Sequence, residues 1–503
     1  MRKLLFALLC LIGVMCSISA MAAEKNEPQF SDPYHYVILE DGTAEITRCD
    51  FVNIDPVLSI PSELDGYKVT KIGRNAFAES GWTDITIPEG VTTIDYNAFF
   101  KCENLTTLHI PDSVTDINEF NPFCKCFNLS RIDISPNHPT LAIMDDTLVR
   151  KSDMCLICPI GLSEQSAYII PQGIEKIGAS AFAYYKNLTS ISIPDSVTAI
   201  GSMAFHCCDS LSDISIPDSV TVIGSAAFGN CISLTDILIP DSVTVIEGWN
   251  PFNYCTSLKE IRLSPDHPTL ELVNGALISQ PDKCLVARPC ASDGSVYEIP
   301  QGIETISAYA FASNQNLTEI ILPDSLTTIG NNAFAECDNL INITIPDSVN
   351  LIGEAAFAGC QALTEFTIPD GVEHIGRSTF LGCTGMTHID IPGSVTSIEM
   401  SAFRSCKALT YIEIPDSVTK IGAEAFYYCP GLTSVVLPNS ITSIGRDAFR
   451  HCDNLTSIVI PDSVTSIGTD AFKECPDELT VTVGRGSYTE NYCMENGLNY
   501  INA

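Results

Sequence analysis

The chain has 503 residues and a strongly acidic composition, with 26 Lys and Arg residues against 61 Asp and Glu residues and a formal net charge of −35 at pH 7. A negative field of this kind repels nucleic acid and anionic membranes, so we expect no nucleic-acid binding and a preference for basic partners. The length alone suggests two or three domains, but the internal repeats described below predict one elongated domain instead.

The first residues are typical of an export signal. Arg2 and Lys3 precede a short apolar run at 4–15, and an A-x-A cleavage site ends at Ala22. We therefore expect cleavage after Ala22, a secreted or cell-surface location, and a flexible segment over 23–33. The apolar run is too short to span a bilayer well, and no later stretch approaches twenty uninterrupted apolar residues, so we expect no membrane insertion.

A lipid anchor is the alternative to a free mature chain. Cys16 could accept a lipid, but the bulky Met15 before it suits lipid attachment poorly. No carboxy-terminal sorting motif or membrane tail follows, so we expect the mature chain to be soluble or held by a partner.

A dipeptide of Ile or Leu followed by Pro recurs along most of the chain. Within two uninterrupted runs its interval is always 23 residues, and such a period is the signature of stacked repeats. The apolar residue of the dipeptide stands at Ile60, Ile87, Ile110, Ile170, Ile193, Ile216, Ile239, Ile299, Leu322, Ile345, Ile368, Ile391, Ile414, Leu437 and Ile460.

One repeat shows the expected local structure. The apolar alternation at 211–216 predicts a short strand with one buried face, and Pro217 ends it because proline has no N–H for the ladder. A turn leads to a second short extended segment at 220–223. Gly224 permits a corner that a side chain would resist, and Ser225–Cys231 is expected to form a helical turn.

A unit of 23 residues cannot bury its own apolar face, because only a neighbouring coil can cover it. Stacked coils provide that cover and share their stability, and the ends of the stack then need caps. The sequence therefore predicts a leucine-rich-repeat solenoid of about fifteen 23-residue coils, with mostly short parallel β-strands and short helical turns, capped at both ends.

Two irregular stretches of the sequence resemble each other at a longer interval. Asn-Pro-Phe begins at Asn121 and again at Asn250, 129 residues later, and other landmarks of the two stretches share this shift. We infer that a block of five coils, one of them enlarged, was duplicated. Each enlarged coil, near 134–170 and near 263–299, is expected to carry a small hairpin.

The consensus of the repeat is Cys-x-x-Leu-x-x-Ile-x-Ile-Pro-x-x-Val-x-x-Ile-Gly-x-x-Ala-Phe-x-x-Cys. It resembles the BspA-like group of leucine-rich repeats, found on surface and secreted proteins of bacteria and some protists. The resemblance implies an amino-terminal cap at 34–70, repeats at 71–476 and a closing, helical cap at 477–503. It also implies adhesion, matrix binding, or contact with a host or another species. The repeat phenylalanines are Phe77, Phe99, Phe123, Phe182, Phe205, Phe228, Phe252, Phe311, Phe334, Phe357, Phe380, Phe403, Phe426, Phe449 and Phe472.

Cysteines form a ladder with one sulfur per coil, three residues after a repeat phenylalanine. A metal site needs ligands clustered at short spacing, so we interpret the ladder as small buried core residues. Disulfides between coils are the alternative, but the side chains of stacked coils point in parallel, which suits a disulfide poorly. The ladder comprises Cys102, Cys126, Cys208, Cys231, Cys255, Cys337, Cys360, Cys383, Cys406, Cys429, Cys452 and Cys475.

A C-x-x-C pair at Cys155 and Cys158 stands apart from this ladder. It could be a redox pair, half a metal site, a local structural disulfide or two free thiols. Its counterpart in the second enlarged coil is Cys284 with Cys290, so the spacing is not kept. No thioredoxin-like strand–helix pattern surrounds it, which disfavours redox chemistry.

Aspartates also recur in nine of the turns after the repeat proline, as Pro-Asp-Ser or, at Asp370, as Pro-Asp-Gly. Calcium could relieve their mutual repulsion, but the turns lack a ligand-dense, Gly-rich loop, so we interpret them as turn-forming residues. They are Asp112, Asp195, Asp218, Asp241, Asp324, Asp347, Asp370, Asp416 and Asp462.

Catalytic motifs are missing from the sequence. The eight histidines are scattered, and two of them, His138 and His267, are equivalent members of Pro-rich turns. No G-x-S-x-G, H-E-x-x-H or phosphate-binding loop occurs. We expect no enzyme, no metal and no cofactor.

A partner would be recognised by residues that packing leaves free, namely the outward positions of the strands. The most varied outward patch comprises Glu365, His388, Asp390, Tyr411 and Glu413, and its aromatic residue is of a kind enriched in interfaces. The alternative is an ordinary solvated sheet face. Two functions therefore remain: a module that binds a protein, matrix or surface ligand, or a structural or protective surface protein without one specific ligand.

Overall fold

The computed structural model describes residues 28–50, 55–162 and 165–503. The predicted export signal, with its cleavage after Ala22, lies outside these residues. Contacts divide the chain into two compact units, Met1–Asp209 and Ser210–Ala503, where the repeats predicted one continuous domain. Each coil of a solenoid contacts only its neighbours, so the repeat pattern does not gather all coils around one core.

The amino-terminal unit begins with an antiparallel sheet that leads into a parallel one. Strands β1, β2 and β3 pair antiparallel, β3 pairs in parallel with β6, and β5 forms a hairpin with β6. These strands are β1 (Gln29–Ser31), β2 (Tyr34–Ile38), β3 (Ala44–Cys49), β5 (Glu63–Leu64) and β6 (Tyr67–Ile72). Within the segment 23–33, for which flexibility stays a prediction, Gln29–Ser31 forms β1 and pairs with β2.

Beyond this sheet each regular coil contributes two short segments, Ile-x-Ile before the proline and a two-residue strand after the turn. Strands of the same kind stack in parallel. In the amino-terminal unit the first kind comprises β4 (Val57–Ser59), β7 (Asp84–Thr86), β9 (Thr107–His109), β11 (Arg131–Asp133), β15 (Ala167–Ile169) and β17 (Ser190–Ser192). The second kind comprises β8 (Thr93–Ile94), β10 (Asp116–Ile117), β16 (Lys176–Ile177) and β18 (Ala199–Ile200).

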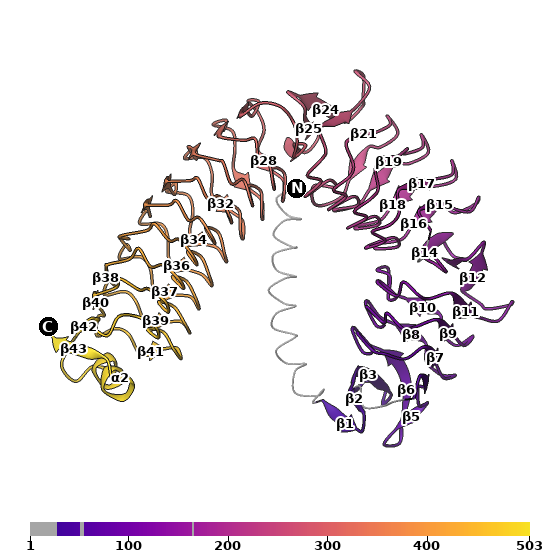
Figure 1. Ribbon diagram of the computed structural model, residues 1–503, viewed down its shortest axis with the longest axis horizontal. Coiled ribbons are helices and arrows are strands. Elements are labelled where there is room, and N and C mark those ends of the chain that lie inside the picture. Colours follow the sequence, from indigo (N-terminus) through magenta and orange to yellow (C-terminus); the bar gives the residue numbers. More distant parts are fainter. Residues whose placement is uncertain (1–27, 51–54, 163–164) are drawn as a thin grey trace. The chain divides into compact units, whose positions relative to one another are not determined.

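The carboxy-terminal unit repeats this arrangement over more coils (Figure 1). Its first strands are β19 (Asp213–Ile214), β21 (Asp236–Leu238), β23 (Glu260–Arg262), β27 (Val296–Glu298), β29 (Glu319–Ile321), β31 (Asn342–Ile343), β33 (Glu365–Thr367), β35 (His388–Asp390), β38 (Ser434–Val436), β40 (Ser457–Val459) and β42 (Thr480–Val483). Its second strands are β20 (Val222–Ile223), β22 (Val245–Ile246), β28 (Thr305–Ile306), β30 (Thr328–Ile329), β32 (Leu351–Ile352), β34 (His374–Ile375), β36 (Ser397–Ile398), β37 (Lys420–Ile421), β39 (Ser443–Ile444) and β41 (Ser466–Ile467). The predicted leucine-rich-repeat solenoid is confirmed.

The hairpin predicted for each enlarged coil is present. In the amino-terminal unit, β12 (Leu141–Met144), β13 (Thr147–Arg150) and β14 (Cys155–Pro159) pair antiparallel, and β14 joins the parallel series through β16. In the carboxy-terminal unit, β24 (Leu270–Val273), β25 (Ala276–Ser279) and β26 (Cys284–Ala287) do the same, with β26 pairing with β28.

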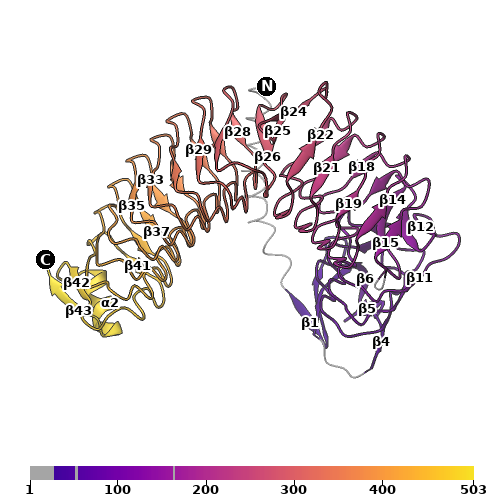
Figure 2. The same ribbon diagram turned by 45° about the horizontal axis from the view of Figure 1, so that its top comes forward.

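The carboxy-terminal end closes with the predicted helix. Helix α2 (Tyr488–Asn496) begins at Ser487, whose Oγ accepts a hydrogen bond from the Glu490 N–H, and ends at the left-handed Gly497. It lies against β41, β42 and the last strand, β43 (Asn499–Asn502) (Figure 2). The helix thereby covers the last coil, which has no following coil to bury it.

The segment that carries the repeat phenylalanine is not the helical turn that the sequence predicted. It is a chain of tight turns with a left-handed residue at every fourth position, such as Asn332 and Glu336. Alternate N–H groups close turns within the coil, and the others, including that of Phe334, donate to carbonyls of the next coil at 2.7–2.9 Å. An α-helix would satisfy its N–H groups internally, so the bonds between coils favour turns.

The glycine before this segment is required by close approach rather than by a corner conformation. A Cβ on Gly330 would lie 2.5 Å from the backbone nitrogen of Ala308, and one on Gly445 would lie 2.3 Å from that of Ala423. Neither glycine has a positive φ. The absent side chain lets the turns of successive coils stack against each other.

The core of each unit is a stack of phenylalanine rings. Phe380, Phe403 and Phe426 are fully buried, with adjacent ring centroids 5.5 and 5.3 Å apart and planes within 8° of parallel. Isoleucine, leucine and valine side chains of the strands surround the stack. Each ring is thus covered by the equivalent ring of the neighbouring coil, which makes the stability of a coil depend on its neighbours.

Candidate functional site

The predicted binding patch lies on the outward face of β33, β35 and the following coil. Glu365 pairs in register with His388 on the neighbouring strand, and Thr367 pairs with Asp390. Between these outward residues, Phe366 and Ile389 point into the core and are 2% exposed. The alternation of a strand therefore fixes which side chains are presented.

All five residues of the patch are exposed. Tyr411 is 47% exposed, and the side chains of His388 and Asp390 are 55% and 62% exposed. Asp390 accepts hydrogen bonds from His388 Nε2 at 2.9 Å and from Thr367 Oγ1 at 3.3 Å. Among the described residues, none hydrogen-bonds the side chain of Tyr411 or Glu413, so the phenol and this carboxylate are available to a ligand.

The patch continues into two outward residues that the prediction does not include, Val436 on β38 and Val459 on β40. Glu413 forms a parallel bridge with Val436, and Val436 pairs in register with Val459. These valines are 54% and 36% exposed. The signal was present in the sequence, because β-branched residues occupied the outward positions there. The five polar and aromatic residues therefore border an exposed aliphatic strip.

The cysteine ladder is built of thiols that donate hydrogen bonds to the backbone. Cys383 Sγ donates to the carbonyl of Phe357, 26 residues earlier, at 3.1 Å, and Cys429 Sγ donates to that of Phe403 at 3.0 Å. The same Phe403 carbonyl also accepts the N–H of Cys406 in its own coil. Burial raises the pKa of the Cys383 and Cys429 thiols to about 12, so they stay protonated at neutral pH and are poor nucleophiles and metal ligands.

The C-x-x-C pair belongs to a buried strand. Cys155 and Cys158 are both on β14, both buried and both free thiols. Burial raises the pKa of Cys155 to about 11, the reverse of the lowered thiol pKa that exchange chemistry uses. This environment favours the free-thiol interpretation over a redox pair.

In the Pro-Asp-Ser turns, the serine and the aspartate have different surroundings. The serine hydroxyls donate to carbonyls of the preceding coil, as Ser417 does to Val395 at 2.6 Å and Ser463 does to Ile441 at 2.7 Å. The nine ladder aspartates are all exposed to solvent. Within residues 28–50, 55–162 and 165–503, no group of three His, Cys, Asp or Glu side chains could hold a metal ion.

The two turn histidines have a structural task. Nδ1 of His138 accepts the N–H of Leu141 at 3.1 Å, and its Nε2 lies 3.1 Å from the carbonyl of Pro111. His267 repeats these contacts with Leu270 and Pro240. Each imidazole thus ties an enlarged coil to the coil before it.

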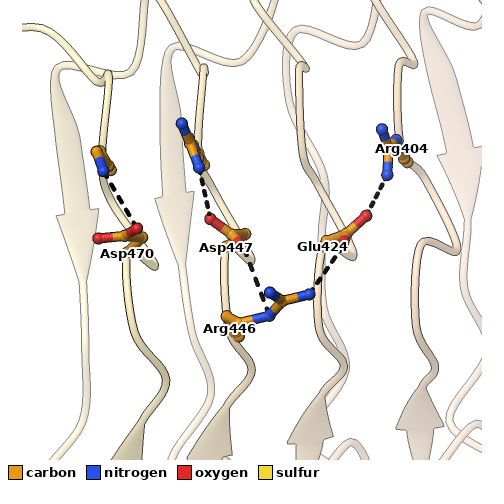
Figure 3. Close-up of polar contacts among 7 residues, drawn as sticks. Arg404, Glu424, Arg446, Asp447 and Asp470 are labelled. Carbon is orange, nitrogen blue, oxygen red and sulfur yellow. Dashed lines mark hydrogen bonds and ion pairs between the residues drawn. The ribbon is translucent and has the colours of Figure 1, made fainter. Parts of the chain in front are cut away.

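A charged network connects coils of the carboxy-terminal unit at the turn segments that carry the repeat phenylalanines (Figure 3). Arg446 contacts both Glu424, at 3.4 Å, and Asp447, at 3.5 Å, while Arg404 pairs with Glu424 and Arg450 pairs with Asp447 at 3.2 Å. Each charged side chain of this network therefore has a partner of opposite charge. We therefore assign the network to the cohesion of the coils and not to ligand binding.

In the part of the chain that the structure describes, no helix is long and apolar enough to cross a membrane.

Comparisons with known proteins agree with the repeat. The model of the BspA-type leucine-rich-repeat region matches residues 58–144, 163–271, 295–410 and 373–499. No curated protein sequence matches the chain significantly.

Several solved structures of leucine-rich-repeat proteins are similar to this chain. One from Eubacterium ventriosum is 22% identical and has a TM-score of 0.50, with 84% of this chain and 93% of that chain covered. One from Bacteroides ovatus is 24% identical and has a TM-score of 0.45, with 95% and 98% covered. A leucine-rich cell surface protein from Faecalibacterium prausnitzii is 23% identical, with 88% and 94% covered and a TM-score of 0.35. The family match spans most of the chain, and the chain therefore belongs to the BspA-type leucine-rich-repeat family.

Proposed function

We propose that this protein is an exported, non-catalytic interaction module that binds a protein, matrix or surface ligand through the outward face of its sheet. Such binding would serve adhesion or contact with a host or another species. The observation that carries the proposal is the exposed patch of Glu365, His388, Asp390, Tyr411 and Glu413, which borders the exposed Val436 and Val459 on β38 and β40. The export part rests on the amino-terminal sequence pattern.

The patch has the make-up of a small interface. Tyr411 offers a large amphipathic surface with little side-chain freedom to lose, as interface tyrosines do. Glu365 and Glu413 add negative charge to the exposed patch, which suits the basic partners that the net charge favours. The backbone that carries these residues is held by buried neighbours such as Phe366 and Ile412, so binding would cost little ordering of the backbone.

The test is binding of the mature chain, residues 23–503, to an array of purified extracellular-matrix proteins, measured by biolayer interferometry. We expect saturable binding to at least one of them, weakened about tenfold or more by Tyr411→Ala with Glu413→Ala, as for an interface anchor. Ser190→Ala with Ser192→Ala, at outward positions of β17, is the matched control and should leave the affinity unchanged. Equal affinities of the two double variants would refute the role of the patch in binding. No saturable binding at all would favour a structural or protective protein.

A further inference from the structure

The two enlarged coils share the register of their strands but differ in polar side chains. Their cross-strand partners coincide after the shift of 129 residues: Arg150↔Cys155 with Ser279↔Cys284, and Cys155↔Lys176 with Cys284↔Thr305. A residue of the first copy can therefore be compared in place with its counterpart in the second.

In the first copy, two cations neutralise one carboxylate. Arg150, the last residue of β13, binds Asp153 through a bidentate pair, with Nε–Oδ1 at 2.9 Å and Nη2–Oδ2 at 3.0 Å. Lys176 adds a third contact, from Nζ to Oδ2 at 3.3 Å. The hydrogen bond from Arg150 is the main reason that the pKa of Asp153 is lowered. The planar guanidinium of Arg150 and the carboxylate of Asp153 thus match in geometry and charge.

In the second copy, the carboxylate is kept and both cations are lost. Asp282 stands in the place of Asp153, while Ser279 replaces Arg150 and Thr305 replaces Lys176. Ser279 Oγ donates to Asp282 Oδ2 at 2.6 Å. The neighbouring Lys283 pairs instead with Glu304. No cationic side chain of the described residues pairs with Asp282.

A cavity of about 480 Å³ opens at this place in the second copy. Leu270, Val286 and Cys284 provide apolar walls, and Ser279, Asp282 and Thr305 are the polar residues of this part of the lining. Cys284 is only half-buried, whereas its counterpart Cys155 is 5% exposed. The volume of the cavity lies within the range of ligand sites. Its lining combines an apolar wall, on which an aliphatic side chain can pack, with one carboxylate.

We propose that this cavity binds a guanidinium group, presented by an arginine side chain of a protein partner, in the manner in which Arg150 binds Asp153 in the first copy. The aliphatic part of an arginine packs on apolar walls while its planar head forms two hydrogen bonds with a carboxylate. The acidic net charge of the chain attracts such a partner. The site lies on β22, β24, β25, β26 and β28, whereas the patch of the proposed function lies on β33, β35 and the following coil. The arginine proposal can therefore be tested independently of the proposed function.

The test is titration of Nα-acetyl-arginine amide into the mature chain at low ionic strength, followed by ligand-observed NMR. We expect one site with a dissociation constant on the order of 1 mM, as for a ligand of this size. Nα-acetyl-citrulline amide, which has the same shape without the charge, should bind at least about tenfold more weakly. Asp282→Asn and Ser279→Arg should each weaken binding to the same extent, the first by removing the acceptor and the second by filling the cavity. Wild-type affinity in both variants would overturn the proposal.

The duplicated block supplies a control by gain of binding. Arg150→Ser with Lys176→Thr gives the first copy the residues of the second at both positions, so we expect a second arginine site in this variant. Asp153→Asn in wild type should leave binding unchanged, because it lies in the filled copy. A stoichiometry that stays at one in the double variant, or loss of binding on Asp153→Asn, would contradict the proposal.

Discussion

The stack of phenylalanine rings allows the coupling between neighbouring coils to be measured. The perturbation is Phe380→Leu and Phe403→Leu, singly and together, because leucine keeps most of the buried apolar surface and removes the ring–ring contacts. The two rings are fully buried, with centroids 5.5 Å apart and planes 7° from parallel. An aromatic pair contributes about 0.5–1.5 kcal/mol beyond its buried area. Phe403 is stacked on two rings, including Phe426, so its replacement should cost about 1–3 kcal/mol.

Urea unfolding followed by far-ultraviolet circular dichroism gives the free energies of unfolding. The coupling energy of Phe380 and Phe403 in a double-mutant cycle should equal one lost pair, about 0.5–1.5 kcal/mol. Phe334 and Phe403 form the control pair, because Phe334 stacks on Phe311 and Phe357 instead. Their coupling should be zero within about 0.5 kcal/mol. Equal coupling in the two cycles, or none in the adjacent pair, would refute the view that each coil is stabilised by the ring of its neighbour.

Two further predictions concern the backbone stacking and the thiols. Gly445→Ala should destabilise by about 3 kcal/mol or more, because its Cβ would lie 2.3 Å from the backbone nitrogen of Ala423. Gly393→Ala, where no heavy atom lies within 4 Å, should change stability by less than about 0.5 kcal/mol; similar melting temperatures for the two variants would contradict this. For Cys383 and Cys429, burial raises the pKa to about 12, above the value of about 8.5 for an unfolded chain. Their contribution is therefore complete below about pH 8.5 and is lost as the pH rises toward 12, by about 1.4 kcal/mol per pH unit for each thiol. The melting temperature should fall from about pH 9 to pH 11 and fall less steeply after Cys383→Ala with Cys429→Ala; an unchanged slope would show that these thiols do not control it.

Much of the fold could be predicted because the same pattern of apolar and polar residues recurs in coil after coil. The alternation before each proline identifies buried residues such as Ile389 and outward ones such as His388 and Asp390, and the structure places all three accordingly. The antiparallel hairpins and the carboxy-terminal helix also agree with the prediction. The error at Ser225–Cys231 has a specific cause. Ala-Phe after a glycine has the same local pattern in a helical turn and in the observed turns, and only hydrogen bonds to the next coil distinguish the two.

The candidate sites differ in how far the sequence could identify them. The sheet-face patch follows from strand alternation, although its extension into Val436 and Val459 requires the register between strands. The arginine cavity was not anticipated. The shift of 129 residues aligns Arg150 with Ser279, but the bidentate contact with Asp153 emerges only from side-chain geometry.

The sequence by itself determined the repeat, the faces of its strands and the family of the protein, because every coil must present apolar residues at the same positions to be covered by an identical neighbour. The tertiary structure decided where polar groups find partners. The cysteine thiols bond to phenylalanine carbonyls about one coil away, the turn N–H groups bond to the next coil, and Asp282 lacks the cations that Asp153 has. These outcomes depend on distances between residues of different coils, which no local pattern contains.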